Sequence, residues 1–326
     1  MLNYLYLFIF SFILGVLLNA ILRIFSLKSN FFRSEKGIPY SGGLGIFLSF
    51  IVCYLLFNFI NGIALPFHIL WVIIFASVLL GIEFIDDWKD FSLSTRVIIQ
   101  IIFISLFLFL GKRMQIYFIP SWLNYVLSFL WIMGITNAFN HLDISDGLCG
   151  GVSLIVGLSF LTVSLIKGDI LLAGLFSSLC GVLLSFLLFN FPPAKILMGN
   201  SGSHLLGFLF ATLSMYGDYA TLENPFALTA PLLILAFPII DTGYIIIMRL
   251  KKRMVPLRKS NDHIFLRLIS LVPNTKNILL SIYTVCLLWG LSGIFIIFGF
   301  NLFFLAFITL AILSTLKLIL KMRFSH

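Results

Sequence analysis

Long apolar runs, separated by short polar segments, dominate the chain from end to end. About eleven of these runs approach the roughly 20 residues that a helix needs to cross the hydrocarbon core of a bilayer. The apolar residues are continuous rather than alternating, so the pattern favours membrane-spanning helices over the strands of a barrel. The runs lie near 3–22, 43–60, 66–84, 97–110, 122–138, 150–166, 170–189, 203–216, 226–248, 278–298 and 301–320, and the fourth and eighth are short.

The composition indicates that lipid surrounds this chain. Of 326 residues, 61% are hydrophobic and 10% are charged, and the mean hydropathy is +1.13. A soluble domain carries about 25% charged residues, and a fold of this size could not hide so much apolar surface from water. These values exclude a soluble enzyme, a disordered chain and a collagen-like fibre. Since no repeat or long linker interrupts the runs, we predict one all-α integral membrane domain over residues 1–326.

Lysine and arginine are distributed unevenly, and this predicts the orientation in the membrane. No basic residue precedes the first apolar run, whereas Arg23, Lys28, Arg33 and Lys36 follow it. This favours an N-terminus outside and a retained first helix rather than a cleavable signal. With eleven spans, 18 of the 21 basic residues fall on the cytoplasmic side, together with the C-terminus. The net charge of +9 therefore reflects topology, and not a polar surface that binds nucleic acid.

Nine of the 12 acidic residues also fall on the predicted cytoplasmic side, although acidic residues contribute little to topology. Asp86, Asp87 and Asp90 end the third apolar run. Adjacent carboxylates need a cation, a proton or strong donors to coexist near a membrane. A site made of oxygen ligands suits Mg²⁺ or Mn²⁺, whereas the four scattered cysteines offer no zinc site. The alternative is a solvated loop that happens to carry charge.

A second polar segment, 137–151, follows the fifth run. It brings two amides and two carboxylates together at Asn137, Asn140, Asp143 and Asp146, and its glycines let the backbone approach a ligand closely. Helix capping and turn formation explain one or two such residues but not this density. We therefore interpret the segment as part of a binding site.

Two further segments on the same side suit anionic ligands. The turn at 198–203 includes Gly199 and Ser201 and opens a helix, where unpaired N–H groups could cradle a phosphate. An ordinary glycine-serine cap is the alternative. The basic loop at 249–276 is explained most simply by topology and by anionic lipid headgroups. Within it, His263 and Arg267 would share one face of a helix and could grip a phosphate.

Together, these four segments are the parts of a phosphoryl-transfer site, with carboxylates for a metal, turns for phosphates and cationic side chains. A site at the membrane surface suits a lipid substrate. A transporter or channel is the main alternative, but it should place ionisable or helix-breaking residues near the middle of several spans. In this sequence the polar groups collect at the inner ends of the runs.

The ordered motifs resemble those of the polyprenyl-phosphate N-acetylhexosamine-1-phosphate transferases, also called glycosyltransferase family 4. The matches extend from about residue 36 to 268 and agree with the many-helix topology of the family. They are Pro39, Gly42 and Gly43 of a Pro-x-x-Gly-Gly motif; Asp86, Asp87 and Asp90 of a DDxxD-type motif; Asn137, Asn140, Asp143, Asp146, Gly147 and Leu148 of NxxNxxDGxDGL, with Ile144 in place of the first glycine; Gly199–Ser203 of GDxGS; and Pro238 and Asp241 of P-x-x-D.

This resemblance implies transfer of a sugar-1-phosphate from a UDP-N-acetyl sugar to undecaprenyl phosphate, with release of UMP and a need for Mg²⁺ or Mn²⁺. It implies a bacterial inner membrane location with the site facing the cytoplasm. Asp86 and Asp87 would lie at the lipid phosphate and the metal, one of them aiding deprotonation of that phosphate, and Asn200 would stand at a metal-binding position. Asn137, Asn140, Asp143 and Asp146 would hold the nucleotide side, and His263 and Arg267 the donor phosphate or sugar.

Two departures from the family motifs bear on activity and substrate. Asn200 replaces the aspartate of GDxGS, so the position supplies an amide oxygen but no charge, which raises the hypothesis of a weakened homologue. The absence of a His-His-His-Phe-Glu string argues against the branch that transfers muramoyl-pentapeptide and favours N-acetylglucosamine or a related sugar. The sugar, the glycan pathway (teichoic acid, capsule, a glycoprotein or the O-antigen of lipopolysaccharide) and assembly as a homodimer stay open.

Overall fold

A computed structural model describes residues 2–29, 33–34, 37–253, 263–271 and 274–323. Within these ranges the chain is helical, apart from loops and one antiparallel bridge between Arg33 and Pro39. The helices are α1 (Leu2–Ser29), α2 (Gly42–Ile60), α3 (Phe67–Lys89), α4 (Leu93–Leu110), α5 (Ser121–Leu142), α6 (Leu148–Lys167), α7 (Ile170–Asn190), α8 (Gly199–Ser214), η1 (Pro225–Thr229), α9 (Ala230–Ile234), α10 (Ala236–Lys251), α11 (Ile264–Ile269), α12 (Thr275–Phe295), η2 (Ile296–Phe298) and α13 (Leu302–Arg323).

Nine of the described helices are long and apolar enough to cross a membrane. A tenth span arises if Pro225–Ile234 and Ala236–Lys251, which meet at a bend of 66°, count as one. The predicted run at 203–216 falls mostly in α8, which ends at Ser214. The 16 residues of α8 reach only about 24 Å, less than the roughly 30 Å of the hydrocarbon core. The chain is thus a multi-pass helical membrane protein, but the structure does not reproduce eleven separate spans of full length.

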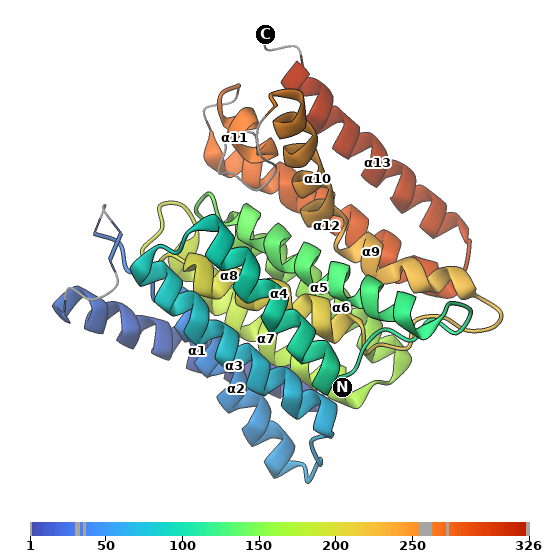
Figure 1. Ribbon diagram of the computed structural model, residues 1–326, viewed down its shortest axis with the longest axis horizontal. Helices are drawn as coiled ribbons and strands as arrows, with labels where there is room; N and C mark the ends of the chain where they lie inside the picture. Colours follow the sequence, from blue (N-terminus) through green and yellow to red (C-terminus); the bar gives the residue numbers. More distant parts are fainter. Residues whose placement is uncertain (1, 30–32, 35–36, 254–262, 272–273, 324–326) are drawn as a thin grey trace.

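Helix α8 is the centre of the bundle, and nearly all its side chains are buried. It packs against α2, α3 and α5, and α1 lies along α7 (Figure 1). At the opposite side of the molecule, α12 and α13 pack together. Large apolar side chains such as Leu5, Ile9 and Leu313 are exposed on α1 and α13, as expected for helices that face lipid.

The entry to α2 supports the start of α8. Leu197 N donates to Pro39 O at 2.8 Å, and Gly42 N donates back to Leu197 O at 3.0 Å. A Cβ atom on Gly43 would lie 2.5 Å from the backbone nitrogen of Gly202, so only glycine permits this approach of α2 and α8. The Pro-x-x-Gly-Gly segment therefore packs behind the turn before α8 and holds it in place.

Candidate active site

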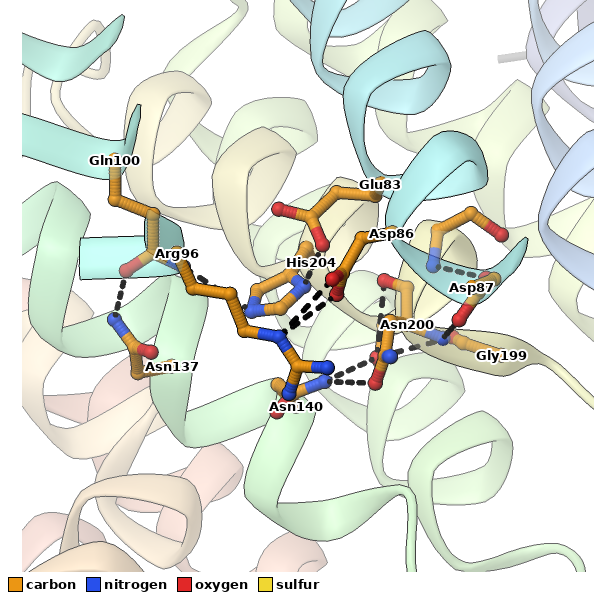
Figure 2. A network of polar contacts seen from close by, with 12 residues as sticks. Glu83, Asp86, Asp87, Arg96, Gln100, Asn137, Asn140, Gly199, Asn200 and His204 are labelled. Carbon is orange, nitrogen blue, oxygen red and sulfur yellow. Dashed lines mark hydrogen bonds and ion pairs between the residues drawn. The ribbon is translucent and has the colours of Figure 1, made fainter. Parts of the chain in front are cut away.

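Two carboxylates from distant segments meet at the first turn of α8. Asn200 N donates to Asp87 Oδ1 and Ser201 N donates to Asp87 Oδ2, each at 3.1 Å (Figure 2). Gly199 has φ of 76°, and a Cβ atom there would lie 3.0 Å from Asp87 Oδ2. The sequence predicted these N–H groups as a phosphate cradle, but the structure gives them to Asp87, because an anion built into the protein satisfies the helix terminus first.

Asp143, in the turn after α5, is the second carboxylate. Burial, followed by repulsion from Asp87, raises the pKa of Asp143 to about 7, although a hydrogen bond from the Gly199 backbone opposes the shift. The two carboxylates therefore crowd each other, as the sequence led us to expect for the acidic residues of this face. A cation between them would relieve the repulsion.

An amide network continues from Asn200. Asn140 Nδ2 donates to Asn200 Oδ1 at 3.0 Å and to Ser203 Oγ at 3.2 Å, so α5 and α8 are joined beside Asp87 (Figure 2). Both N–H groups of Asn140 are used in this way, and the amide oxygen of Asn200 keeps a second lone pair. The structure thus brings together Asp87, Asn140, Asp143 and Asn200 from three sequence segments.

Asp86 lies in a different environment from Asp87. Its side chain is 2% exposed, and Arg96 Nε lies 3.0 Å from its Oδ2. Phe91 N donates to Asp86 Oδ1 at 2.8 Å, and Arg96 Nη2 also lies 2.6 Å from Asp90 Oδ1. These contacts hold the end of α3 against the start of α4. The catalytic role predicted for Asp86 stays a prediction, and the geometry adds a structural role to it.

Sequence reasoning missed Arg96 as a site residue. Its charge was assigned to topology, but it is the cation that pairs with two of the three DDxxD carboxylates (Figure 2). The available signal was a basic residue one loop after an acidic cluster, at the start of the next helix. Opposite charges on adjoining helix ends are expected to pair.

Asn137 and Asp146 contact the protein framework. Asn137 Nδ2 donates to Met133 O at 2.8 Å and to Gln100 Oε1 at 3.1 Å. Asp146 Oδ2 accepts from Ala194 N at 2.9 Å, which ties the segment after α5 to the loop after α7. Their predicted roles in nucleotide binding stay predictions, and each retains an oxygen that these contacts do not use.

His263 lies at the start of α11 and is buried. Its Nδ1 is 3.4 Å from Asp241 Oδ2, and Asp241 Oδ1 accepts from Ile264 N at 3.0 Å. Asp241 therefore caps α11 and orients the imidazole. The Arg267 guanidinium lies over the Tyr244 ring at 5.5 Å, one helical turn beyond His263. Other members of the predicted basic loop, Arg258, Lys259 and Asp262, lie outside the described residues.

The donor set suits a divalent cation that is held mostly by substrate. Among the described residues, no three His, Cys, Asp or Glu side chains form a ready-made metal cage. Asp87, Asp143 and the Asn200 amide nevertheless offer hard oxygen ligands, and the crowding that raises the pKa of Asp143 gives a reason for a cation to bind. Mg²⁺ is commonly held by one or two carboxylates, with waters and substrate phosphates completing its shell. The residues present therefore fit Mg²⁺.

A cavity of about 870 Å³ lies between α5 and the bent pair formed by α9 and α10. At one end it reaches Ala138 and Thr242, which are neighbours in sequence of Asn137 and Asp241. At the other end it reaches Lys112 and Arg113, beyond α4. Its walls are mainly apolar, with Leu127, Leu130, Gly134, Leu232, Ile239 and Ile246 among them.

Known proteins resemble this chain over the segments that form the site. Residues 69–218, which include Asp87, Asn140 and Asn200, match the pattern that defines glycosyl transferase family 4. The chain is 31% identical over 269 residues to the "Probable undecaprenyl-phosphate N-acetylglucosaminyl 1-phosphate transferase" of Bacillus subtilis, an alignment that covers 80% of this chain and 74% of the relative. The chain belongs to glycosyl transferase family 4.

Other members of glycosyl transferase family 4 show the range of its substrates. The undecaprenyl-phosphate alpha-N-acetylglucosaminyl 1-phosphate transferase of Thermotoga maritima is 29% identical, over 78% of this chain and 79% of its own. A phospho-N-acetylmuramoyl-pentapeptide-transferase of Listeria monocytogenes is 28% identical, over 56% of this chain and 62% of its own. The two N-acetylglucosaminyl transferases align with more of this chain than the muramoyl-pentapeptide transferase does.

Proposed function

We propose that this protein transfers an N-acetylhexosamine-1-phosphate from a UDP-sugar to undecaprenyl phosphate. An oxygen of the lipid phosphate attacks the sugar-bearing phosphorus of the donor. The P–O bond to the nucleotide phosphate breaks, and UMP leaves with the electron pair of that bond. The names of the relatives support the lipid phosphate and the N-acetylhexosamine-1-phosphate group, and the motif resemblance implies the UDP donor. Asp87 at the first turn of α8 is the observation that carries the proposal.

In this reaction the residues of the site bring two anions together. Asp87 and Asp143, with the Asn200 amide oxygen, would hold Mg²⁺ or Mn²⁺, which supplies charge to offset repulsion between the phosphates. Arg96 and the first turn of α8 hold Asp86 and Asp87, respectively, in place at the same end of the bundle. His263, oriented by Asp241, would donate a hydrogen bond to a donor phosphate. Most of the rate would come from alignment and charge stabilisation.

The cavity along α5 supports a lipid acceptor. Its apolar walls suit a polyprenyl chain, and its inner end reaches the helix turns that carry Asn137 and Asp241. A chain lying in it would bring its phosphate to the site without leaving the membrane. We place this end of the bundle on the cytoplasmic side of a bacterial inner membrane, because 18 of the 21 basic residues fall there under the predicted topology.

The deciding experiment measures UMP release by the purified protein with undecaprenyl phosphate, Mg²⁺ and a panel of UDP-N-acetyl sugars. We expect turnover with at least one donor and a lipid-linked product that mild acid cleaves, since a sugar pyrophosphate is acid-labile. Reactions without the lipid phosphate are the control. UMP binding without turnover for any donor would instead support a weakened homologue with a binding role.

We expect Asn200→Asp to strengthen metal binding. The substitution adds a third carboxylate beside Asp87 and Asp143 while keeping the acceptor for Asn140 Nδ2. The apparent affinity for Mg²⁺, from the metal dependence of UMP release, should rise about tenfold, which corresponds to about 1.4 kcal/mol. Thermal unfolding without metal should move to lower temperature because the carboxylates repel. An unchanged metal dependence would place the cation away from position 200.

A further inference from the structure

A second acidic residue lies beneath the site, one turn deeper in the membrane. Glu83 on α3 precedes Asp87 by four residues, and His204 on α8 follows Asn200 by four. Because the two helices run in opposite directions, the contact of Asp87 with Asn200 is repeated one turn, about 6 Å, further in by Glu83 with His204. His204 Nδ1 lies 2.8 Å from Glu83 Oε2 (Figure 2).

Both members of this pair are buried. Glu83 and His204 are each 5% exposed, although they lie in helices that are otherwise mostly apolar. An ionisable residue inside a membrane bundle is costly and is retained where it has a function. No sequence motif gives Glu83 or His204 a role, and the proposed reaction uses neither residue.

Glu83, His204, Gln100 and Asn137 form a chain of polar contacts, and the contacts of Asn137 fix which group donates in each. Asn137 uses its amide nitrogen for Met133 O and Gln100 Oε1. The nitrogen of Gln100 therefore faces His204 Nε2, at 3.2 Å. Since an amide nitrogen only donates, His204 Nε2 must accept and the ring proton must sit on Nδ1, facing Glu83.

The network leaves one acceptor for a ligand. With its nitrogen committed to Met133 and Gln100, Asn137 turns its Oδ1 away from Gln100 (Figure 2). The Asn137 side chain is partly exposed, and within the described ranges no group donates to its Oδ1. If the Asn137 amide were reversed, its Oδ1 would face the carbonyl oxygen of Met133, and the two acceptors would repel. The orientation of this acceptor is therefore fixed by groups that lie deeper in the bundle.

We propose that Glu83 and His204 are positioning residues that act through Gln100 to present Asn137 Oδ1 as an acceptor for the nucleotide of the donor substrate. The inference rests on the proposed function, because it takes the donor to be a UDP-sugar. Neither Glu83 nor His204 touches substrate. Asn137 Oδ1 would accept a hydrogen bond from an N–H or O–H group on the uridine half of the donor, and it would not bind the lipid phosphate.

The test compares His204→Leu with His204→Gln in the purified full-length protein. Leucine cannot accept from Gln100, so we expect the KM for the UDP-sugar to rise about tenfold while the KM for undecaprenyl phosphate stays within twofold. Glutamine can accept from Gln100 and donate to Glu83, so it should restore most of the donor affinity. The pair Glu83→Leu with His204→Leu should lose no more donor affinity than His204→Leu alone.

A matched control lies in the α12–α13 contact, where Trp289 Nε1 donates to Thr315 Oγ1 in another buried pair. Thr315→Val removes that bond far from the site and should leave both KM values unchanged. We expect Thr315→Val to lower only the unfolding temperature. The inference is wrong if His204→Leu does the same, or if it shifts both KM values equally.

Direct binding of UMP separates this inference from the proposed reaction. A wild type that binds UMP but transfers no sugar would overturn the proposed function, and a tenfold weaker affinity for UMP in His204→Leu would still support the positioning role. Equal affinity for UMP in the two proteins would overturn the positioning role even if transfer is observed. A wild type that binds no UMP would overturn both.

Discussion

Asp87→Asn is expected to lower the rate of UMP release by about 10³-fold or more. The carboxylate accepts one N–H at each oxygen from the first turn of α8. An asparagine presents an oxygen to one N–H and its own N–H₂ to the other, and it removes the charge with which Asp87 would hold a divalent cation. Loss of a charged group aimed at a phosphoryl-transfer centre has effects of this size. The measurement is initial rate at saturating donor and lipid.

Asp86→Asn is the matched comparison, since it makes the same change at the adjacent position. Asp86 is buried against Arg96 and caps the end of α3. Its substitution should mainly lower the unfolding temperature, because Arg96 loses its buried partner and keeps only the exposed Asp90. We expect a loss of turnover of about tenfold. If Asp87→Asn retained a tenth of the wild-type rate, or if both variants lost activity equally, the separate roles would be refuted.

His263→Ala is expected to lower kcat about 10²-fold. Under the proposed function the imidazole would donate a hydrogen bond to a donor phosphate, and groups that transfer or share a proton at a reacting centre contribute 10²–10⁴-fold. Asp241→Asn should have a smaller effect, about tenfold, because Asp241 orients His263 and caps α11. Both effects are measured as kcat for UMP release, with folding followed by thermal unfolding in detergent.

His68→Ala provides a control with the same residue type. His68 is in the first turn of α3, at the end of that helix opposite Asp87, where its ring lies 5.2 Å from the Tyr216 ring. Its removal should leave kcat unchanged. A similar loss in His68→Ala and His263→Ala would mean that the effect comes from general destabilisation, and the role of His263 would have to be abandoned.

Some features could be predicted from the sequence because they depend on local composition. Long apolar runs require helices in lipid, since each backbone group must find its partner within the segment. Alternation of the runs then puts every second junction at the same end of the bundle. This is why the segments around Asp87, Asn140 and Asn200 were expected together, and the structure brings them together. The family could be recognised because its motifs occupy these junctions.

Other features depend on how each helix is rotated about its axis, and only the tertiary structure decided these. An almost wholly apolar helix has no polar stripe that fixes which face turns inward. The sequence therefore offers no basis for giving Asp86 and Asp87 different roles. Packing of α3 against α8 turns Asp87 to the N-terminus of α8 and Asp86 to Arg96. The same packing pairs Glu83 with His204, two residues that no local pattern connects.

The physical reason for this division is the range of the forces involved. Burial of apolar surface and the unequal distribution of charge act on whole segments, and a sequence displays both directly. A hydrogen bond or ion pair needs atoms placed within a few tenths of an ångström, which follows from close approaches such as that of Gly43 to Gly202. The sequence alone therefore determined a helical membrane protein with its polar chemistry at one end, and the packing of α3, α5 and α8 decided which groups form the site.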